Sequence, residues 1–254
     1  MIEIRDVGLK IRGRAILESV NLDISPGDFW LIFGPNGAGK TTLFKIVTGM
    51  VEAGTGTVRV AGKELKNHTR RSLAREISYL PQFDEFNLPV TVRDILLAGR
   101  YPYAPWWQGY LPSDIEKMET AARQLGLEDF LQRDINTLSG GERKMVMLAS
   151  AFIQDVSTIL LDEPYTFLDP RAIFLLNEKL QQLNEQGKTM VVISHQIDLI
   201  HPLASKMAAF KNGRLHFSGD WVYDPVLFEK TYGVAASHWR AANRSVESSG
   251  GGIR

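Results

Sequence analysis

Alternating hydrophobic and polar positions open the chain. The alternation covers residues 2–7 and returns over residues 15–24. A period of two is that of a strand whose two faces meet different surroundings, one apolar and one polar. These segments therefore predict an antiparallel β layer at the start of the chain, which a short β segment at residues 56–60 would extend.

Short, continuous apolar runs appear next along the chain. They are typical of parallel strands that are buried on both faces. Their alternation with helical patterns predicts an α/β fold built on a parallel sheet. The runs occupy residues 29–33, 77–80, 157–162, 191–194 and 206–211, and a turn at Gly213 precedes a further strand at 214–219.

Helical patterns fill most of the remaining chain. One follows the first apolar run at residues 43–47, and another is expected from Gly62 to about Glu76. A longer helical stretch with proline and glycine breaks extends to Ile153 and predicts an inserted helical subdomain. We expect one domain over residues 1–244, with its core at 1–82 and 157–244, the helical subdomain at about 83–156, and a flexible tail at 245–254.

Composition narrows the classes of function. The 254 residues are 44% hydrophobic and 23% charged, with a formal net charge of zero, so a substantial core is expected and nucleic acid is not. The lack of cysteine excludes disulfides and fits a reducing compartment. No apolar run reaches the roughly 18–20 residues of a membrane helix, and residues 1–5 do not resemble a signal peptide. We expect a cytoplasmic protein, with any membrane-spanning part on another polypeptide.

A glycine-rich motif stands between the first apolar run and the helical pattern after it. It has the form GxxxxGKT, a phosphate loop in the strand-to-helix context that this motif requires. Backbone N–H groups would surround the phosphates of a nucleoside triphosphate, Lys40 would reach the β and γ phosphates, and the Thr41 hydroxyl would bind Mg²⁺. The residues expected to bind the nucleotide here are Gly34, Pro35, Asn36, Gly37, Ala38, Gly39, Lys40, Thr41 and Thr42.

Two adjacent carboxylates end the apolar run at residues 157–162. A buried parallel strand would deliver both acids at its carboxyl edge, next to the phosphate loop. Asp162 fits the acid that holds Mg²⁺, and Glu163 is placed to polarise the attacking water. The alternative is a pair of solvated acids at the end of a strand, which the nearby phosphate loop disfavours.

A second glycine-containing motif, LSGGE, precedes an apolar helical pattern. Ser139 and Glu142 have the spacing of a capping box, which many ordinary helices use. Gly140 and Gly141 would also expose backbone N–H groups at the helix start, which makes the motif a candidate anion site. Both interpretations stay open at this point.

With these motifs in order, the sequence resembles an ATP-binding cassette (ABC) subunit of an ABC transporter. The family's signature motif is LSGGQ, and its fold is a RecA-like P-loop NTPase core with an antiparallel β layer and an inserted helical subdomain. The resemblance implies that Gln82 contacts the metal and the attacking water, that Asp169 belongs to the D-loop, and that His195 is the switch histidine. On its own, a histidine after a strand would more often be structural.

Three positions depart from the family pattern. The signature ends in Glu142, and Phe167 stands in the D-loop where a small residue is usual. The aromatic side chain that stacks on adenine is missing, and its place is held by Ile11 with Arg12 beside it. Either the Arg12 guanidinium stacks on the base or Ile11 packs against it.

Aromatic residues gather after Gln82 in a stretch broken by prolines. Trp and Tyr supply large contact area at interfaces, so the stretch from Phe83 to Tyr110 is a candidate docking surface, and the alternative is packing beneath a loop. In the family this region receives the membrane subunit. A basic run that includes Arg71 and Arg75 is interpreted as a solvated face.

The resemblance also implies a partner set and a cargo. Residues 91–102 and 226–234 are similar to cassettes that serve importers of siderophores, haem and cobalamin. We expect an ATPase at the inner face of the cell membrane, with a permease, a substrate-binding protein in the same system, and no nucleic acid. Two copies would enclose two ATP molecules, each between one phosphate loop and the partner's signature. The alternatives are a soluble iron–sulfur cluster assembly ATPase and a non-hydrolysing scaffold.

Overall fold

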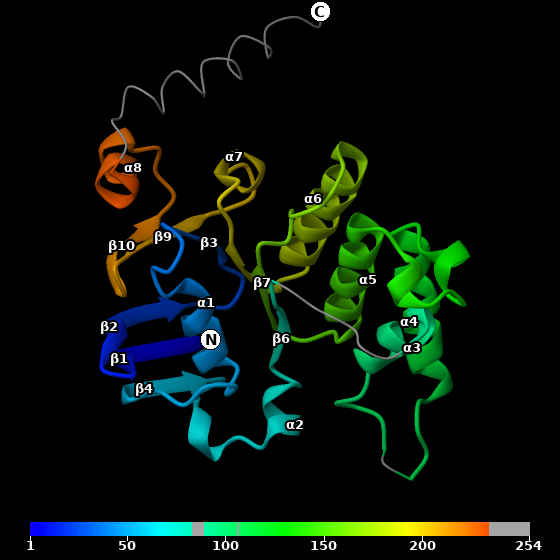
Figure 1. Cartoon of the computed structure of the whole chain (residues 1–254). Helices are drawn as coiled ribbons and strands as arrows, with labels where there is room; N and C mark the ends of the chain where they lie inside the picture. Colours follow the sequence, from blue (N-terminus) through cyan, green and yellow to red (C-terminus); the bar gives the residue numbers. More distant parts are fainter. Residues whose placement is uncertain (83–88, 106, 234–254) are drawn as a thin grey trace, which may run out of the picture.

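The computed structural model describes residues 1–82, 89–105 and 107–233. Two sheets form the part of the chain shown on the left of Figure 1. The smaller sheet is antiparallel and has the order β2-β1-β4-β5. Its strands are β1 (Ile2–Ile11), β2 (Arg14–Ile24), β4 (Thr55–Val60) and β5 (Lys63–Glu64).

The larger sheet has six strands in the order β10-β9-β3-β8-β7-β6. All neighbours are parallel except β10, which runs antiparallel to β9. This confirms the predicted parallel sheet. The strands are β3 (Phe29–Phe33), β6 (Ile77–Leu80), β7 (Thr158–Asp162), β8 (Thr189–Ile193), β9 (Lys206–Lys211) and β10 (Arg214–Asp220).

Burial on both faces explains the continuous apolar runs. In β3, Trp30 and Ile32 join the core between the two sheets, together with helix α1 (Lys40–Val47). Leu31 and Phe33 point to the opposite face and join the core under the helices that follow β6 in the chain. Successive side chains of a strand alternate between faces, so each must be apolar when both faces are covered.

Helices cover the second face and extend to the side. The helical region, defined here as α3 (Val92–Ala98), α4 (Pro112–Gln124), α5 (Gly140–Ile153) and their connections, lies on the right of Figure 1. Its buried side chains belong to the same core as that face of the sheet. The other helices on this side are α6 (Pro170–Glu185), α7 (Ile197–Ile200) and α8 (Pro225–Tyr232).

The predicted helix from Gly62 to Glu76 is wrong for most of its length. Only a 3-10 turn (Leu65–Asn67) and the short α2 (Arg70–Leu73) form there. Thr69 starts α2 by accepting a hydrogen bond from Ser72 N–H, and Leu73 is the single buried residue of that helix. Leu73 is buried and Leu65 only partly so in this otherwise polar segment, and this small apolar surface does not extend the helix by packing. Across the described ranges, no helix combines the length and hydropathy that a membrane crossing needs.

Candidate nucleotide-binding site

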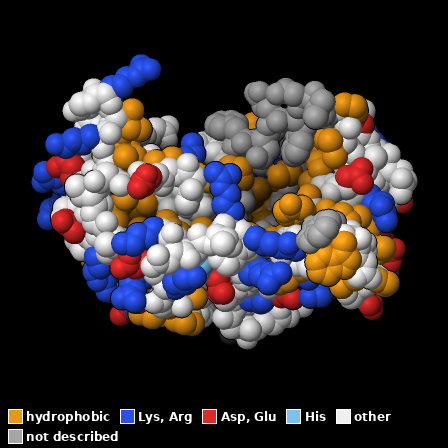
Figure 2. Space-filling model, turned by 90° about the horizontal axis from the view of Figure 1, so that it is seen from below, with side chains coloured by type: hydrophobic (Ala, Val, Ile, Leu, Met, Phe, Trp, Pro, Cys, Tyr) orange, Lys and Arg blue, Asp and Glu red, His pale blue; other side chains and the backbone are white. Residues whose placement is uncertain are grey.

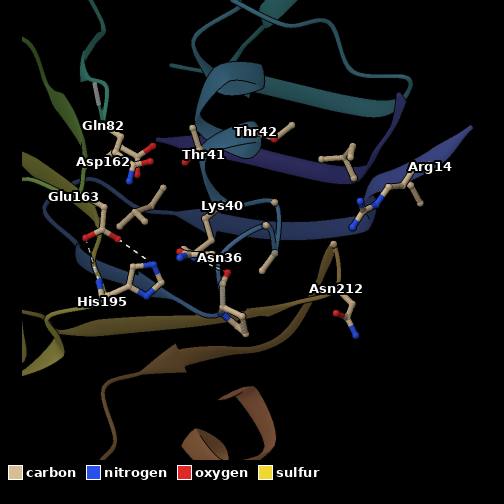
Figure 3. Close-up of a pocket in the computed structure, with 18 residues that line it drawn as sticks. Arg14, Asn36, Lys40, Thr41, Thr42, Gln82, Asp162, Glu163, His195 and Asn212 are labelled. Carbon is tan, nitrogen blue, oxygen red and sulfur yellow. Dashed lines mark hydrogen bonds and ion pairs between the residues drawn. The ribbon is translucent and has the colours of Figure 1, made fainter. Parts of the chain in front are cut away.

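A cavity of about 780 Å³ lies where the carboxyl ends of β3, β7 and β8 meet. Parallel strands present their ends at one edge of a sheet, and open α/β sheets place their ligand sites there. Figure 3 shows Lys40, Asp162, Glu163 and His195 converging on this space. The structure therefore brings together residues that are more than 150 positions apart in the sequence.

The phosphate loop forms the floor of the cavity and leads directly into α1. Its conformation depends on glycine at two positions. Gly34 has φ 144°, and a Cβ there would lie 2.1 Å from the Phe210 carbonyl oxygen. Gly39 has φ 100°, and a Cβ there would lie 2.8 Å from the Ile16 carbonyl oxygen. A side chain at either position would displace the loop.

Lys40 is buried at the start of α1. Its ammonium donates to the carbonyl oxygens of Gly34 (2.6 Å) and Pro35 (2.9 Å). Burial lowers the pKa of Lys40, while the charges of Glu163 and Asp162 act in the opposite direction. The loop thus holds a cation beside its own backbone, on the wall where phosphates would bind.

Asp162 and Glu163 are both buried at the end of β7. Burial raises the pKa of each carboxyl, against the opposing effect of the Thr41 hydroxyl on Asp162 and of the His195 N–H on Glu163. Asp162 Oδ2 and Glu163 Oε1 accept no hydrogen bond from the described residues. Two buried acceptor atoms facing a cavity leave room for ligands that supply protons or positive charge.

His195 follows β8 and faces Glu163. Its backbone N–H donates to Glu163 Oε2 (3.3 Å), and its ring Nε2 lies 3.4 Å from Glu163 Oε1. Partial burial, and then the Lys40 charge, lower the pKa of His195. The imidazole is thereby favoured in its neutral form next to the acid. Gln82 lines the same cavity two residues beyond β6.

The LSGGE motif does not line this cavity. Ser139 caps α5: its Oγ accepts from Glu142 N–H (3.3 Å), and Glu142 Oε2 accepts from Ser139 N–H (2.8 Å). The hydroxyl and N–H of Ser139 lower the pKa of Glu142. The motif is therefore a capping box in this chain, and a Cβ added at Gly140 or Gly141 would lie against Phe167. An anion role for it stays a prediction.

Asp169 does not line the cavity either. Its carboxylate caps α6 by accepting a hydrogen bond from Ala172 N–H (2.8 Å). Ile11, which ends β1, and Arg12, in the turn after it, were expected at the adenine and do not line the cavity either. The wall on that side consists of residues that the sequence analysis missed: Arg14, Ala15, Ile16, Asn212 and Gly213.

The turn between β9 and β10 explains this missed wall. Gly213 N–H donates to the Ala38 carbonyl (3.2 Å), and the Gly213 carbonyl accepts from Glu18 N–H (2.8 Å). These bonds fix the turn against the phosphate loop and β2. The sequence does signal this turn through Gly213, whose φ of 77° favours glycine. The sequence analysis predicted the turn but not its contact with the phosphate loop.

Fold and site together define a P-loop nucleoside triphosphatase. The sequence matches the ABC transporter family over residues 17–166, more than half of the chain. The chain therefore belongs to the ABC transporter family and carries its ATPase domain.

Characterised relatives are similar over most of the chain. The achromobactin transport ATP-binding protein CbrD of Dickeya dadantii is 32% identical over 82% of this chain and 78% of its own length. The petrobactin import ATP-binding protein YclP of Bacillus subtilis is 32% identical over 85% of both. The ferric enterobactin transport ATP-binding protein FepC of Escherichia coli is 30% identical over 86% of this chain and 82% of its own length.

Solved structures show the same fold. An ATP-binding subunit of an ABC transporter superimposes with a TM-score of 0.81 at 22% identity, over 95% of this chain and 98% of that chain. The dimeric bacterial ABC transporter cassette MJ0796 gives a TM-score of 0.76 at 26% identity, over 87% of this chain and 98% of that chain.

Proposed function

We propose that this chain hydrolyses ATP to drive import of a metal chelate through a separate membrane permease. The observation that carries the ATPase half is the convergence of the phosphate loop, Lys40 and two buried acids on one cavity. Relatives named for achromobactin, petrobactin and ferric enterobactin transport support the cargo class. None of these three relatives is named for iron–sulfur cluster assembly, so they do not favour the alternative function of a soluble assembly ATPase.

Nucleotide binding rests on the loop and on Lys40. The glycine-rich loop leads into the start of α1, whose first turn holds no acidic residue that would compete with a phosphate for the backbone N–H groups there. Lys40 now donates to two carbonyl oxygens, and the phosphates offer the same ammonium stronger, anionic acceptors. The base would lie toward Arg14 and Ile16, on the wall beside β2.

The site also suits Mg²⁺. The described residues contain no group of three or more His, Cys, Asp or Glu side chains that could hold a metal by themselves. Mg²⁺ typically binds one or two protein groups together with substrate phosphates, and Asp162 Oδ2 is a buried oxygen without a hydrogen-bond partner in that part of the chain. Thr41, Asp162 and Gln82 would hold the ion, and it would neutralise phosphate charge.

Hydrolysis is assigned to Glu163. Its raised pKa, and an Oε1 atom that accepts no hydrogen bond from the described residues, suit a general base that accepts the proton of the attacking water. His195 holds the second carboxylate oxygen through its backbone N–H, and its ring lies on the wall of the cavity where a γ-phosphate would bind. Gln82, on the opposite wall, would sense the same phosphate.

Two copies complete the site in this proposal. Ser139, Gly140, Gly141 and Glu142 lie outside the cavity of their own chain, and so they suit a phosphate held by the partner copy. Asp169 would lie at the same junction. The dimeric cassette MJ0796 shows that a structure of this fold assembles in pairs.

The membrane partner would dock near residues 83–110 and hold the protein at the inner face of the cell membrane. Trp107 is 71% exposed and Tyr101 is 70% exposed, as an interface requires before its partner binds. Residues 83–88 and 106 lie outside the described residues. The proposed system also contains a substrate-binding protein, which would deliver the chelate to the permease from the opposite side of the membrane.

Uptake of radiolabelled metal chelates tests this function. Cells that lack the gene are complemented with the wild-type chain or with Lys40→Ala, and a panel of siderophores, haem and cobalamin is supplied. Restoration by the wild type alone, for at least one chelate, is the expected result. Wild-type complementation that restores iron–sulfur enzyme activity without restoring uptake would contradict the proposal.

A further inference from the structure

A second cavity, of about 370 Å³, lies at the seam between α2 and the helical region. One wall comes from the α2 side, with Thr69, Arg71 and Arg75, and the other from the loop after α3, with Tyr103, Pro105 and Trp107. Figure 2 shows this face from below, where basic side chains lie beside hydrophobic ones around a hollow. The cavity is separate from the nucleotide site, with which it shares no lining residue.

Two arginines join the walls. Arg71 Nε donates to the Pro102 carbonyl (2.9 Å), and a second nitrogen of Arg71 donates to the Ala104 carbonyl. Arg75 Nε donates to the same Pro102 oxygen (2.9 Å). Arg71 and Arg75 are both exposed, as the interpretation of this basic run as a solvated face expects, but both also bind the loop of the helical region. Their hydrogen bonds hold the guanidinium groups at the cavity while the side chains stay exposed to solvent.

An aromatic ring completes this arrangement. The Tyr103 ring lies 5.5 Å from the Arg75 guanidinium and 4.1 Å from that of Arg100. Arg100 is buried and pairs with Asp114 (2.8 Å), so its charge is neutralised. Across the described residues, neither Arg71 nor Arg75 pairs with an acidic side chain. The cavity thus holds two guanidinium charges that lack a counter-ion within that part of the chain.

Charge and shape together select the occupant. A guanidinium that uses only Nε, as Arg75 does, keeps two terminal nitrogens for a carboxylate. Beside it, Pro105 and the exposed Trp107 offer an apolar wall. A short protein segment that carries a carboxylate side chain next to apolar residues could pair with the guanidinium on one wall and pack against the apolar residues of the other.

We propose that this cavity receives an Asp or Glu side chain from a cytoplasmic segment of the membrane permease, bound by Arg71 and Arg75 with neighbouring apolar residues against Trp107. This inference rests on the proposed function, because it assumes that permease. The same arginines bind the loop of the helical region, so an occupant would pull directly on the connection between α2 and that region.

The test measures affinity between the chain and its permease in detergent, over a range of salt concentrations. Arg71→Gln with Arg75→Gln removes both charges but leaves amide donors for the carbonyl oxygens. We expect about tenfold weaker binding and a flatter dependence on salt. Arg75→Gln alone, which leaves both Arg71 hydrogen bonds in place, should show a smaller change in the same direction.

A matched control lies on the same helix. Arg70 is exposed and does not line the cavity, so Arg70→Gln removes an equal charge and should leave affinity unchanged. The ATPase activity of each isolated variant should match that of the wild type. A charge exchange then identifies the partner residue: Arg75→Glu weakens binding, and one permease acid changed to Lys restores it.

Three results would overturn this inference. The first is an affinity for the permease that the double variant leaves unchanged. The second is a loss of affinity in Arg70→Gln as large as that in the double variant. The third is a double variant that loses binding to phosphatidylglycerol vesicles but keeps its binding to the permease. If the wild-type chain forms no complex with the permease, the proposed function itself fails. A wild-type complex that the double variant leaves intact rejects only the acidic contact.

Discussion

Glu163 combines two properties that a base needs: a raised pKa, and an Oε1 atom that accepts no hydrogen bond from the described residues. Replacement by Gln keeps the size of the side chain and the hydrogen bond from His195, but removes the acceptor for a proton. We expect ATP turnover to fall by about a hundredfold or more while ATP stays bound. Steady-state phosphate release and equilibrium binding of labelled ATP measure the two effects. Turnover near the wild-type rate would exclude Glu163 as the base.

The same carboxyl links pH to stability. Its pKa is raised in the folded protein, so the folded state holds its proton more tightly than the unfolded chain does. The stabilisation is complete below the ordinary glutamate pKa of 4.5 and is lost as the pH rises through the raised value. At neutral pH the buried charge therefore opposes folding.

Glu163→Gln should consequently melt at a higher temperature than the wild type at about pH 7.5, and the difference should shrink below about pH 4. Glu178→Gln, at an exposed position of α6, is the control and should show neither effect. Calorimetry of the three proteins across pH supplies the comparison. A difference that grows as the pH falls would show that the sign of this linkage is wrong.

At the scale of elements, the phosphate loop depends on contact with β9. In Gly34→Ala, the new Cβ would meet the Phe210 carbonyl at 2.1 Å, and we expect a loss of about 2–4 kcal/mol of stability together with ATP binding. Gly37 also has positive φ, but a Cβ there meets nothing within 4 Å. Gly37→Ala should therefore cost about 1 kcal/mol. Thermal denaturation of the two variants with and without ATP measures these effects. Equal losses of stability in Gly34→Ala and Gly37→Ala would contradict the expected clash with the Phe210 carbonyl.

Elements with strong local patterns were predictable, and tertiary contacts were not. Residues 206–211 form β9 as expected, because its four inner residues are apolar and buried on both faces of the sheet, between a lysine at each end. The helix expected before Glu76 fails because α2 buries only Leu73. The wall at Arg14 and Asn212 was missed because it forms where the β9–β10 turn meets β2, a contact that no local pattern encodes.

At the scale of the whole molecule, the separation of Ser139 from the cavity predicts complementation between two inactive variants. Lys40→Ala disables the phosphate loop. Ser139→Asp keeps an N-cap for α5 but places a negative charge where the partner's phosphate would bind. Each variant alone should be inactive in the complex with the permease. A mixed pair retains one site in which both halves are intact.

Random pairing of equal amounts should restore about a quarter of the sites. ATPase assays of the mixture, against each variant assayed alone, give the measurement. A mixture as inactive as its components would mean that phosphate loop and signature do not act across two chains.

The position of β3 has a consequence for synthesis of the protein. This strand carries the phosphate loop, yet it pairs only with β8 and β9 in the larger sheet. On a ribosome that adds about 5–20 residues per second, the first pairing residue of β8 emerges roughly 8–30 s after β3. The strands of the antiparallel sheet all lie within the first 64 residues, so that sheet can form before the pairing partners of β3 have been synthesised. Nucleotide therefore cannot assist the early steps of folding, because its site is assembled only when the last third of the chain arrives.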